Sequence, residues 1–495
     1  MAWSDYCAAS TTVAHALGCI YFTRPHMSVF SSIALDLGST SIKGGAVDAD
    51  GNLAVLATRP APPVSSSAGR FESDALAYAL AAEAVLAACR ATVPHALSLG
   101  LCCQRSSFLI WERTSGKPLT PLISWQDDRG SASCVALRHA EGEIIQRTGL
   151  RLAPYYLAPK LSVALFEHPE LRARIEAGEC LVGTLDTFLV WRWSGGRHFI
   201  TDASMAARTL LMDIVEMRWS SRLCGLFGIP ESRLASIRPS IGVGVPLENG
   251  MILNACLADQ SAALIGAAGL AGEGAGPADV LVNLGTGGFG LRYAAVGCPL
   301  PPGYLQTLVY QNTAGHGHLA MEGTLNSLAA ALAPYPAAAC RWEDLAQDDI
   351  YCLAEPSGLG APYFREELGL TFSEPVAHLP AGRVACLLLE AIVFRVARML
   401  EDFHRVSPIG RVLLSGGLSQ LPALRQGLAQ CAPYPLLLLK EPEASLHGAA
   451  LLAAGRAGPS HAAGAVIAPA STRGRLQEKY LGWKRWLDAL LARPR

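Results

Sequence analysis

Charged residues are scarce in this chain. Asp, Glu, Lys and Arg make up 16% of its 495 residues, compared with roughly 25% in an average soluble domain. The 40 Lys and Arg residues are balanced by 41 Asp and Glu residues, so the formal net charge is -1. The chain therefore lacks the basic excess with which nucleic-acid-binding proteins attract phosphate backbones. A hydrophobic content of 51% excludes a disordered polyampholyte and supplies a large core.

Disulfide and zinc patterns are also missing. The 14 cysteines are scattered and include no C-x-x-C pair, and the histidines form no cluster at metal-ligand spacing. Reduced thiols are typical of the cytosol, so we expect a cytoplasmic protein.

The sequence also offers no convincing membrane-spanning segment. The uncharged stretch 6–23 contains Ser, Thr, His and Gly throughout and has no Lys or Arg before it, which argues against a signal peptide or a membrane span. Met27 lies just before the first predicted strand. We therefore interpret residues 1–30 as an N-terminal extension, of which residues 1–26 are either loose or upstream of the true start.

The order of apolar segments indicates an α/β protein of two to four domains. Residues 32–37, 42–47 and the segment after the turn at 48–51 predict three consecutive strands. An Ala-rich helix is expected at 73–90, with Ser73 as its cap, and a buried strand at 97–103. Helices and strands then alternate to about residue 266. The Gly/Pro-rich segment 269–277 is the expected domain boundary.

Two glycine-hydroxyl turns follow apolar strands, one near the start of each half of the chain. The first is Gly38-Ser39-Thr40-Ser41, after the strand that ends in Asp36-Leu37, and the second is Gly285-Thr286-Gly287, after Asn283-Leu284. Glycine lets backbone N–H groups approach an anion closely, and the hydroxyls donate hydrogen bonds to phosphate oxygens. The repeat suggests a duplicated architecture.

A third glycine turn, at 415–417, lies between a predicted strand (411–414) and a predicted helix (422–430). This order places helical N–H donors at a phosphate or a nucleoside. One such turn is usually ordinary loop structure, but three at strand ends favour nucleotide binding.

At this point the motifs resemble those of the FGGY carbohydrate kinase family, over roughly residues 31–455. The motif order is most like that of glycerol kinases, with some xylulokinase-like features. The motifs are IALDLGSTSIK (33–43), QRSSFLIWERTSGKPLTPLISWQDDR (104–129), GTLDTFLVWRWSGG (183–196), TDASMAARTLLMDI (201–214), LADQSAALIGA (257–267), NLGTGGF (283–289), GLGAPYF (358–364), SGGLSQLPAL (415–424) and EASLHGAALLAAG (443–455).

The resemblance implies two ribonuclease-H-like domains, as in actin and hexokinase, flanking a cleft in which ATP, Mg²⁺ and a small polyol or sugar meet. Residues 31–268 would form the substrate-side domain, residues 278–458 the nucleotide-side domain and residues 459–495 a tail. We expect no nucleic-acid or membrane partner, and the sequence leaves open whether the protein is a homodimer or a tetramer.

The resemblance also implies the catalytic groups. Asp259 matches the base that takes the proton of the attacking hydroxyl. On spacing alone, it would instead cap the helix expected at 260–268. Asp36 matches the acid that holds hydrated Mg²⁺, a hard cation that prefers carboxylates, with Asp259 as the second metal-side acid. The alternative for Asp36 is a turn residue bonded to its own backbone.

Nucleotide contacts follow from the same motifs. The expected phosphate-side residues are Gly38, Ser39, Thr40, Ser41, Lys43, Gly285, Thr286 and Gly287, and the expected adenosine-side residues are Gly416, Gly417 and Gln420. A solvated strand lysine is nearly as good an interpretation of Lys43. The segment between Gly323 and Pro334 is shorter than usual in the family, and Leu421 replaces a common Asn. Both departures affect the adenine side.

On the substrate side, the resemblance selects Gln104, Arg105, Ser106, Trp125, Asp127, Tyr155, Asp259, Gln260 and Phe289. Glycerol kinases carry Glu directly after the Arg, where this chain has Ser106, so a charged acceptor for two hydroxyls is missing. Asp127 and Arg129 resemble the xylulose-type pattern instead. Core packing is the alternative for Tyr155 and Phe289, whereas for Trp125 we favour contact with the substrate's carbon chain.

We therefore expect an ATP-dependent kinase that phosphorylates a primary hydroxyl of glycerol, another polyol or a ketose. A regulatory nucleotide-binding protein that has lost transfer is the second hypothesis, and an actin-like or chaperone-like ATPase is the third. At the C-terminus, residues 480–493 predict a short amphipathic helix that packs on the domain surface rather than on a membrane.

Overall fold

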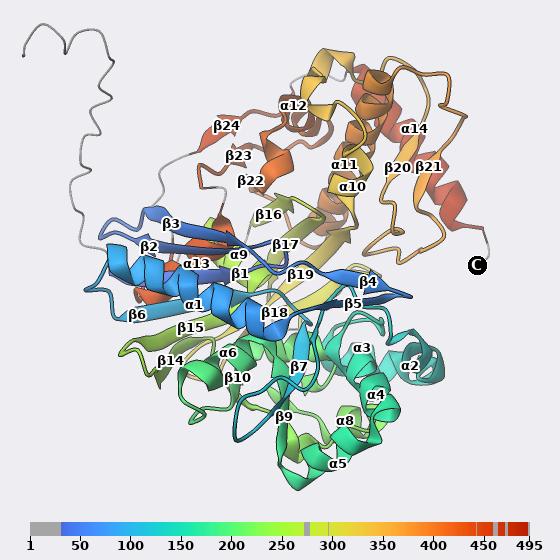
Figure 1. The fold of residues 1–495 in the computed structure, drawn as a ribbon. Helices are drawn as coiled ribbons and strands as arrows, with labels where there is room; N and C mark the ends of the chain where they lie inside the picture. Colours follow the sequence, from blue (N-terminus) through green and yellow to red (C-terminus); the bar gives the residue numbers. More distant parts are fainter. Residues whose placement is uncertain are drawn as a thin grey trace, which may run out of the picture.

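The computed structural model describes residues 31–271, 278–295, 297–441, 443–458, 464–470 and 474–493. The expected extension 1–30 and most of the expected boundary segment 269–277 lie outside these residues. The described chain forms two large sheets with helices packed on them, one sheet in each half of the sequence (Figure 1).

The first sheet has six strands. Their order is β14 (Ile241–Pro246), β15 (Ile252–Ala258), β6 (Ser98–Cys103), β1 (Ser32–Leu37), β2 (Ser41–Val47), β3 (Leu53–Pro60). Strands β1, β2 and β3 form an antiparallel meander, as the turn signals predict, whereas β1, β6 and β15 are parallel. The carboxyl ends of these three parallel strands therefore lie at one edge of the sheet.

The second sheet resembles the first in its strand pairing and has one additional strand, β18, at one edge. Its order is β18 (Leu305–Gln311), β19 (Gly317–Leu325), β17 (Gly288–Ala294), β16 (Asp279–Leu284), β22 (Arg411–Ser415), β23 (Leu436–Leu438), β24 (Ala465–Ile467). Strands β16, β17 and β19 are antiparallel like β1, β2 and β3, and β22 and β23 add in parallel like β6 and β15. Two ribonuclease-H-like domains, each opening on a glycine-hydroxyl turn, are thus present.

A subdomain carries the substrate-side motifs, and most of it is inserted between β6 and β15, whereas its first two strands, within residues 65–73, precede β6. It contains a five-stranded sheet and several helices. The strands are β4 (Ser65–Ser67), β5 (Arg70–Ser73), β8 (Leu122–Ile123), β7 (Phe108–Glu112) and β9 (Cys180–Thr184). The helices are α2 (Ser131–Ala136), α3 (Glu141–Thr148), α4 (Leu157–Glu167), α5 (Pro169–Ala177), α6 (Leu185–Trp193), α7 (Ala203–Ala206) and α8 (Ser221–Phe227).

Short strand pairs and further helices complete the described fold. The pairs are β10 (Ile200–Asp202) with β13 (Ser236–Arg238), β11 (Met212–Asp213) with β12 (Arg218–Trp219), and β20 (Cys352–Ala354) with β21 (Leu370–Phe372). The remaining helices are α1 (Ala75–Thr92), α9 (Asp259–Ala268), α10 (Leu328–Leu332), α11 (Ala381–Val406), α12 (Pro422–Cys431), α13 (Ala444–Ala453) and α14 (Arg475–Leu491).

Helix α1 is the one described helix that is long and apolar enough, by length and composition, to cross a membrane. In the fold it packs on β2 and β3 through residues such as Tyr78, Val85 and Cys89, which are at most 1% exposed. Its cap is Asp74, whose side chain accepts a hydrogen bond from the Ala77 N–H, and not Ser73 as the sequence suggested. The apolar face is thus the core face of a domain helix.

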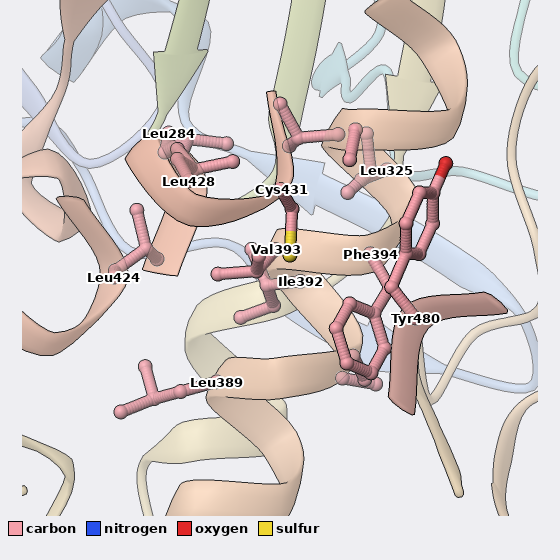
Figure 2. Close-up of a cluster of buried hydrophobic side chains, with 14 of the residues drawn as sticks. Leu284, Leu325, Leu389, Ile392, Val393, Phe394, Leu424, Leu428, Cys431 and Tyr480 are labelled. Atoms are coloured by element: carbon pink, nitrogen blue, oxygen red, sulfur yellow. The ribbon is translucent and has the colours of Figure 1, made fainter. Parts of the chain in front are cut away.

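The core of the C-terminal domain surrounds α11 and incorporates the tail helix α14 (Figure 2). Phe394 of α11 stacks near Tyr480 of α14, with ring centroids 5.4 Å apart. Trp483 is fully buried and donates its indole N–H to the Cys352 carbonyl at 2.8 Å. The tail helix therefore packs back on the domain, as the sequence predicted, and its aromatic face is part of the core.

Helices α9 and α13 cross each other at the centre of the molecule and join the two domains. In Figure 1, α13, from the end of the chain, lies beside β1 and α9 of the N-terminal half. A Cβ atom on Gly448 would lie 2.0 Å from the Ala262 carbonyl oxygen, and one on Gly266 would lie 2.1 Å from that of Ala444. Only glycine therefore permits this backbone approach.

Gly448→Ala is expected to separate α9 from α13 and to lower the free energy of unfolding by roughly 1–3 kcal/mol, as overpacking does. The measurement is equilibrium unfolding in urea. Gly142→Ala on α3 is the control, because a Cβ there meets nothing within 4 Å, and alanine in a helix is better than glycine by about 0.5–1 kcal/mol. Equal stability of the two variants would contradict the tight crossing.

Candidate active site

Two aspartates lie at the shared carboxyl edge of the parallel strands of the first sheet. Asp36 is the next-to-last residue of β1, and Asp259 follows β15 as the first residue of α9. Strand β6 separates them, with Cys102 paired to Asp36 on one side and to Leu257 on the other. The N-cap of α9 is Ala258, and no side chain caps the helix there. Oδ1 of Asp259 accepts a hydrogen bond from the N–H of the next residue, Gln260, at 2.8 Å.

The two carboxyl groups interact electrostatically. Burial raises the pKa of Asp36 to about 7, and the negative charge of Asp259 acts in the same direction, whereas Lys43 opposes it. Burial also raises the pKa of Asp259, while Arg105 and the Gln260 N–H lower it. Two crowded, partly desolvated carboxylates are a donor set that fits a hard divalent cation.

The predicted glycine-hydroxyl turns from the two domains line one cleft of about 340 Å³. Ser39 and Thr40 belong to the β1–β2 turn, and Thr286 belongs to the β16–β17 turn. Trp125, which is 39% exposed, lies in the same cleft. The remaining lining residues are Ala61, Pro62, Pro63, Val64 and Gln126. Both turns and the predicted substrate-side tryptophan therefore face a common space.

The third glycine turn packs against the end of β16. Gly416 has a φ of 85°, and a Cβ there would lie 2.3 Å from the Leu284 carbonyl oxygen and 2.6 Å from Oδ1 of Asn283. Gly417 has open space around it, and Gln420 is exposed. The Gly285 N–H donates to the Gly287 carbonyl at 2.8 Å. The two glycine turns of the second sheet are thus neighbours.

Arg105 lies between Asp259 and the second domain. Its Nε is 3.5 Å from Oδ1 of Asp259, and its Nη1 donates to both carboxylate oxygens of Glu322 at 3.2 and 3.1 Å. The guanidinium also lies over the Phe289 ring, 5.3 Å from its centroid. One cation therefore connects the two domains beside the proposed base.

Ser106 faces away from the cleft. It has a φ of 66° and is 4% exposed, and its hydroxyl donates to the Arg208 carbonyl at 3.2 Å. Gln104 is also turned inward, since its Oε1 accepts the Ser107 hydroxyl at 3.0 Å. The Ser107 oxygen in turn accepts the Trp125 N–H at 3.0 Å. Inward side chains thus connect the loop after β6 to the tryptophan loop.

Lys160 of α4 holds these two loops together from below. Its Nζ donates to the Ser106 carbonyl at 2.8 Å and to the Ser124 carbonyl at 2.7 Å, and it is fully buried. Burial lowers the pKa of Lys160 to about 7, although Asp127 acts to raise it. Both carbonyls directly adjoin a predicted substrate residue, so Lys160 fixes their backbone.

Several predicted site residues have partners within the protein. The Asp127 carboxylate is fully buried and accepts hydrogen bonds from Arg129 and from the Phe71 N–H. Lys43 donates to Glu443 at 2.6 and 2.5 Å. The charges of Asp127 and Lys43 are therefore each paired with an opposite charge of the protein itself. We therefore propose that Asp127 orders the loop rather than contacting substrate.

Two further predicted site residues, Tyr155 and Gln260, also form hydrogen bonds with other side chains of the protein. Tyr155 donates its hydroxyl hydrogen to Tyr156 at 3.4 Å, with ring centroids 4.5 Å apart. The Gln260 Oε1 accepts from Asn283 of the second domain at 3.3 Å. Direct substrate contact by Tyr155 or Gln260 stays a prediction.

A separate acidic cluster lies inside the first domain. Asp186, Asp202 and Cys256 place one ligand atom each within 4.8 Å of one another. The Asp202 oxygens already accept the N–H groups of Ser204 and Met205 as a helix cap, together with the Ser240 hydroxyl. We assign this cluster a structural role.

Family models match both halves of the chain. The model of the N-terminal domain of the FGGY family of carbohydrate kinases matches residues 31–266, and that of the C-terminal domain matches residues 280–457. The chain belongs to this family. The family, the two-domain fold and the phosphotransferase class expected from the motif order are therefore confirmed.

Curated FGGY relatives cover nearly the whole chain. Apulose kinase from Pectobacterium atrosepticum is 32% identical over 499 residues, which is 93% of this chain and 98% of that protein. Glycerol kinase from Xanthobacter autotrophicus is 32% identical over 452 residues, which is 85% of this chain and 89% of that protein.

Solved structures with the same fold include kinases of both substrate types. Glycerol kinase from Plasmodium falciparum, solved with ADP, has a TM-score of 0.79 at 20% identity and covers 94% of this chain and 99% of its own. Xylulose kinase from Rhodospirillum rubrum has a TM-score of 0.77 at 20% identity, with 93% and 100% covered. At these identities, the likeness establishes the fold alone.

Sequence reasoning missed three buried charges of the FGGY site: Lys160, Arg208 and Glu322. Arg208 lies inside the motif at 201–214 but received no role there, and Glu322 directly precedes Gly323, where the shortened segment begins, and also received no role. Lys160 follows the Tyr155-Tyr156 pair by one helical turn. The sequence signal that could have indicated Lys160 is its position as the one charged residue in the apolar segment Leu157–Leu161.

Lys160→Met should raise the KM for the acceptor at least about tenfold, because two buried carbonyls lose their donor and the two loops loosen. The KM for ATP should change less than about twofold, since neither turn of the nucleotide side contacts Lys160. Steady-state kinetics provide the measurement, and the exposed Lys117→Met is the control. Equal changes in both KM values would argue against loop positioning.

Asp36→Asn should stabilise the protein at alkaline pH. A carboxyl with a folded-state pKa of about 7, against 3.8 for a free Asp, disfavours the native state increasingly as pH rises between these values. We expect an unfolding temperature higher by roughly a few degrees at pH 8 and unchanged near pH 4, without Mg²⁺.

Asp348→Asn provides a control of opposite sign for this experiment. Burial acts to raise the pKa of Asp348, but hydrogen bonds from Arg383 and Lys479 lower it to about 2. Its removal should therefore destabilise the protein at pH 8 and matter less as pH falls towards 2. Destabilisation by Asp36→Asn at pH 8 would refute the raised pKa of Asp36.

Proposed function

We propose that this FGGY kinase transfers the γ-phosphoryl group of ATP to a primary hydroxyl of glycerol, another polyol or a ketose, with Mg²⁺ as cofactor. The observation that supports the proposal best is the pairing of Asp36 and Asp259 at the edge of the first sheet. Glycine-hydroxyl turns from both domains line the adjoining cleft. These are the parts that phosphoryl transfer requires, namely positioning and charge neutralisation with a proton acceptor.

In this proposal Asp259 accepts the proton of the attacking hydroxyl. Its Oδ1 accepts the Gln260 N–H at 2.8 Å, which orients the carboxylate at the start of α9. The raised pKa brings the carboxylate nearer to neutral pH, where a base transfers protons most effectively. Arg105 orients the acceptor, and Trp125 packs along its carbon chain.

Asp36 and Asp259 would hold Mg²⁺, which neutralises phosphate charge when it is bound. The hydroxyls of Ser39, Thr40 and Thr286 would donate hydrogen bonds to phosphate oxygens. Gly416, Gly417 and Gln420 would line the adenosine side. Lys43 reaches phosphate only if its pair with Glu443 opens, so we propose that its main effect is on the Asp36 carboxyl.

The acceptor class follows from the inward orientation of Ser106. Ser106 therefore cannot replace the carboxylate that would accept hydrogen bonds from two hydroxyls at this position in glycerol kinases. The relatives named above include an apulose kinase and glycerol kinases. We propose that ketoses and polyols other than glycerol are the better acceptors.

We also propose a cytoplasmic location. The twelve cysteines among the described residues are free thiols, and ten of them are buried. Free thiols in this number fit a reducing compartment.

Asp259→Asn should lower turnover by about 10²-fold or more with little change in ATP affinity, because the amide cannot accept the proton. The measurement is coupled ADP release with glycerol, xylulose, ribulose, sedoheptulose, erythritol and gluconate, together with ATP titration. Asp50→Asn, on an exposed turn, is the control. Near-normal turnover of Asp259→Asn would exclude its role as base.

The same panel of acceptors distinguishes a kinase from a regulatory nucleotide-binding protein. The second possibility is considered because Ser106 stands where glycerol kinases carry Glu. Binding of ATP without consumption of any panel member would support the regulatory protein. Hydrolysis of ATP at equal rates with and without acceptor would instead support an ATPase.

A further inference from the structure

A buried carboxylate of the C-terminal domain is held by two arginines of the N-terminal domain. Glu322 of β19 has no exposed surface. Its oxygens accept hydrogen bonds from Nη1 of Arg105 at 3.2 and 3.1 Å and from Nη1 of Arg208 at 3.2 Å. The Thr307 hydroxyl of β18 also donates to Glu322. The main charge partners of Glu322 therefore belong to the other domain.

Glu322 is ionised at every pH at which the protein would work. Burial alone would raise the pKa of Glu322, but the guanidinium groups of Arg105 and Arg208 lower it to about 2. A buried ion pair with one partner removed leaves an uncompensated charge. The position of β19 relative to the first domain thus fixes the position of the Arg105 side chain.

Arg105 has two acidic neighbours that compete for it. Glu322 binds its Nη1 through two oxygens, whereas Asp259 lies 3.5 Å from its Nε. Nη2 of Arg105 donates to no residue of the described chain. The pair with Glu322, together with the Phe289 ring below, leaves this donor free for a ligand and keeps the guanidinium from closing onto Asp259.

We propose that Glu322 is a positioning residue that reaches across the domain boundary and holds Arg105 for an acceptor hydroxyl while leaving Asp259 free to act as base. This inference rests on the proposed kinase function. It makes acceptor recognition depend on the relative position of the two domains, although Glu322 itself is buried and touches no substrate.

The test is steady-state kinetics of the full chain carrying Glu322→Gln, with the acceptor that gives the highest wild-type activity. We expect the acceptor KM to rise at least about tenfold, because a charge-assisted hydrogen bond to Arg105 is weakened. The KM for ATP should change less than about twofold, and this split between the two KM values is what a merely structural role would not produce.

Glu322→Asp is the second variant, and it separates charge from reach. It keeps the negative charge but shortens the side chain, so a rise in its acceptor KM shows that the reach of Glu322 to Arg105 matters as well as its charge. Glu390→Gln is the control for lost stability. Glu390 is likewise buried and ion-paired in the C-terminal domain, but its partners are Arg383 and Lys479.

The outcomes distinguish this inference from the proposed function. Wild-type protein without acceptor-dependent ATP consumption would refute the kinase proposal itself. A second outcome is that the wild-type protein is active while the Glu322 variants change kcat and both KM values equally, as we expect for Glu390→Gln. That result refutes the positioning role and leaves the kinase proposal intact. If Glu322→Gln does not fold, an unchanged acceptor KM in Glu322→Asp overturns the inference, and a rise in that KM supports it.

Discussion

The crossing of α9 and α13 is the constraint on which the rest of the molecule depends. Gly266 and Gly448 allow the helix backbones to approach more closely than any side chain would permit. Asp259 is the first residue of α9, and Glu443, which pairs with Lys43, immediately precedes α13. The packing that joins the domains therefore also sets the acidic groups beside the cleft.

Charge at the domain boundary is balanced locally. Asp36 and Asp259 repel each other, and Lys43 and Arg105 partly offset that repulsion. The raised pKa values of both acids show that the fold holds these two carboxyl groups in an arrangement that disfavours their charged forms, which is typical of sites that bind a cation or transfer a proton. Glu322 draws Arg105 towards the second domain. The ionisation of Asp36 and Asp259 therefore depends on the relative position of the two domains.

The loops of the substrate side are held in place mainly by buried side chains. Lys160 and Ser107 bind backbone atoms of the loops that present Arg105 and Trp125, and Asp127 accepts the Phe71 N–H of β5. Their own side chains are buried and make no contact with the cleft. A serine at position 106 fits this arrangement because its hydroxyl also turns inward. Specificity in this chain is consequently expected to come from a few cleft-facing groups on rigid loops.

The sequence by itself determined the local structure, because short-range rules govern it. The three-strand meander, the glycine-hydroxyl turns and the positions of Asp36 and Asp259 at strand ends all follow from apolar runs and glycine placement, and the motif order identified the family. The predicted Ser73 cap was wrong, because Asp74 lies one residue closer to α1 and its side chain accepts the Ala77 N–H. The tail helix packs back on the domain as predicted, and the tertiary structure decided that its aromatic side chains enter the core. Only the tertiary structure decided the partners of Glu322, Arg208, Lys43 and Lys160. Their charges are met by residues tens to hundreds of positions away, and no local pattern encodes which buried charge meets which.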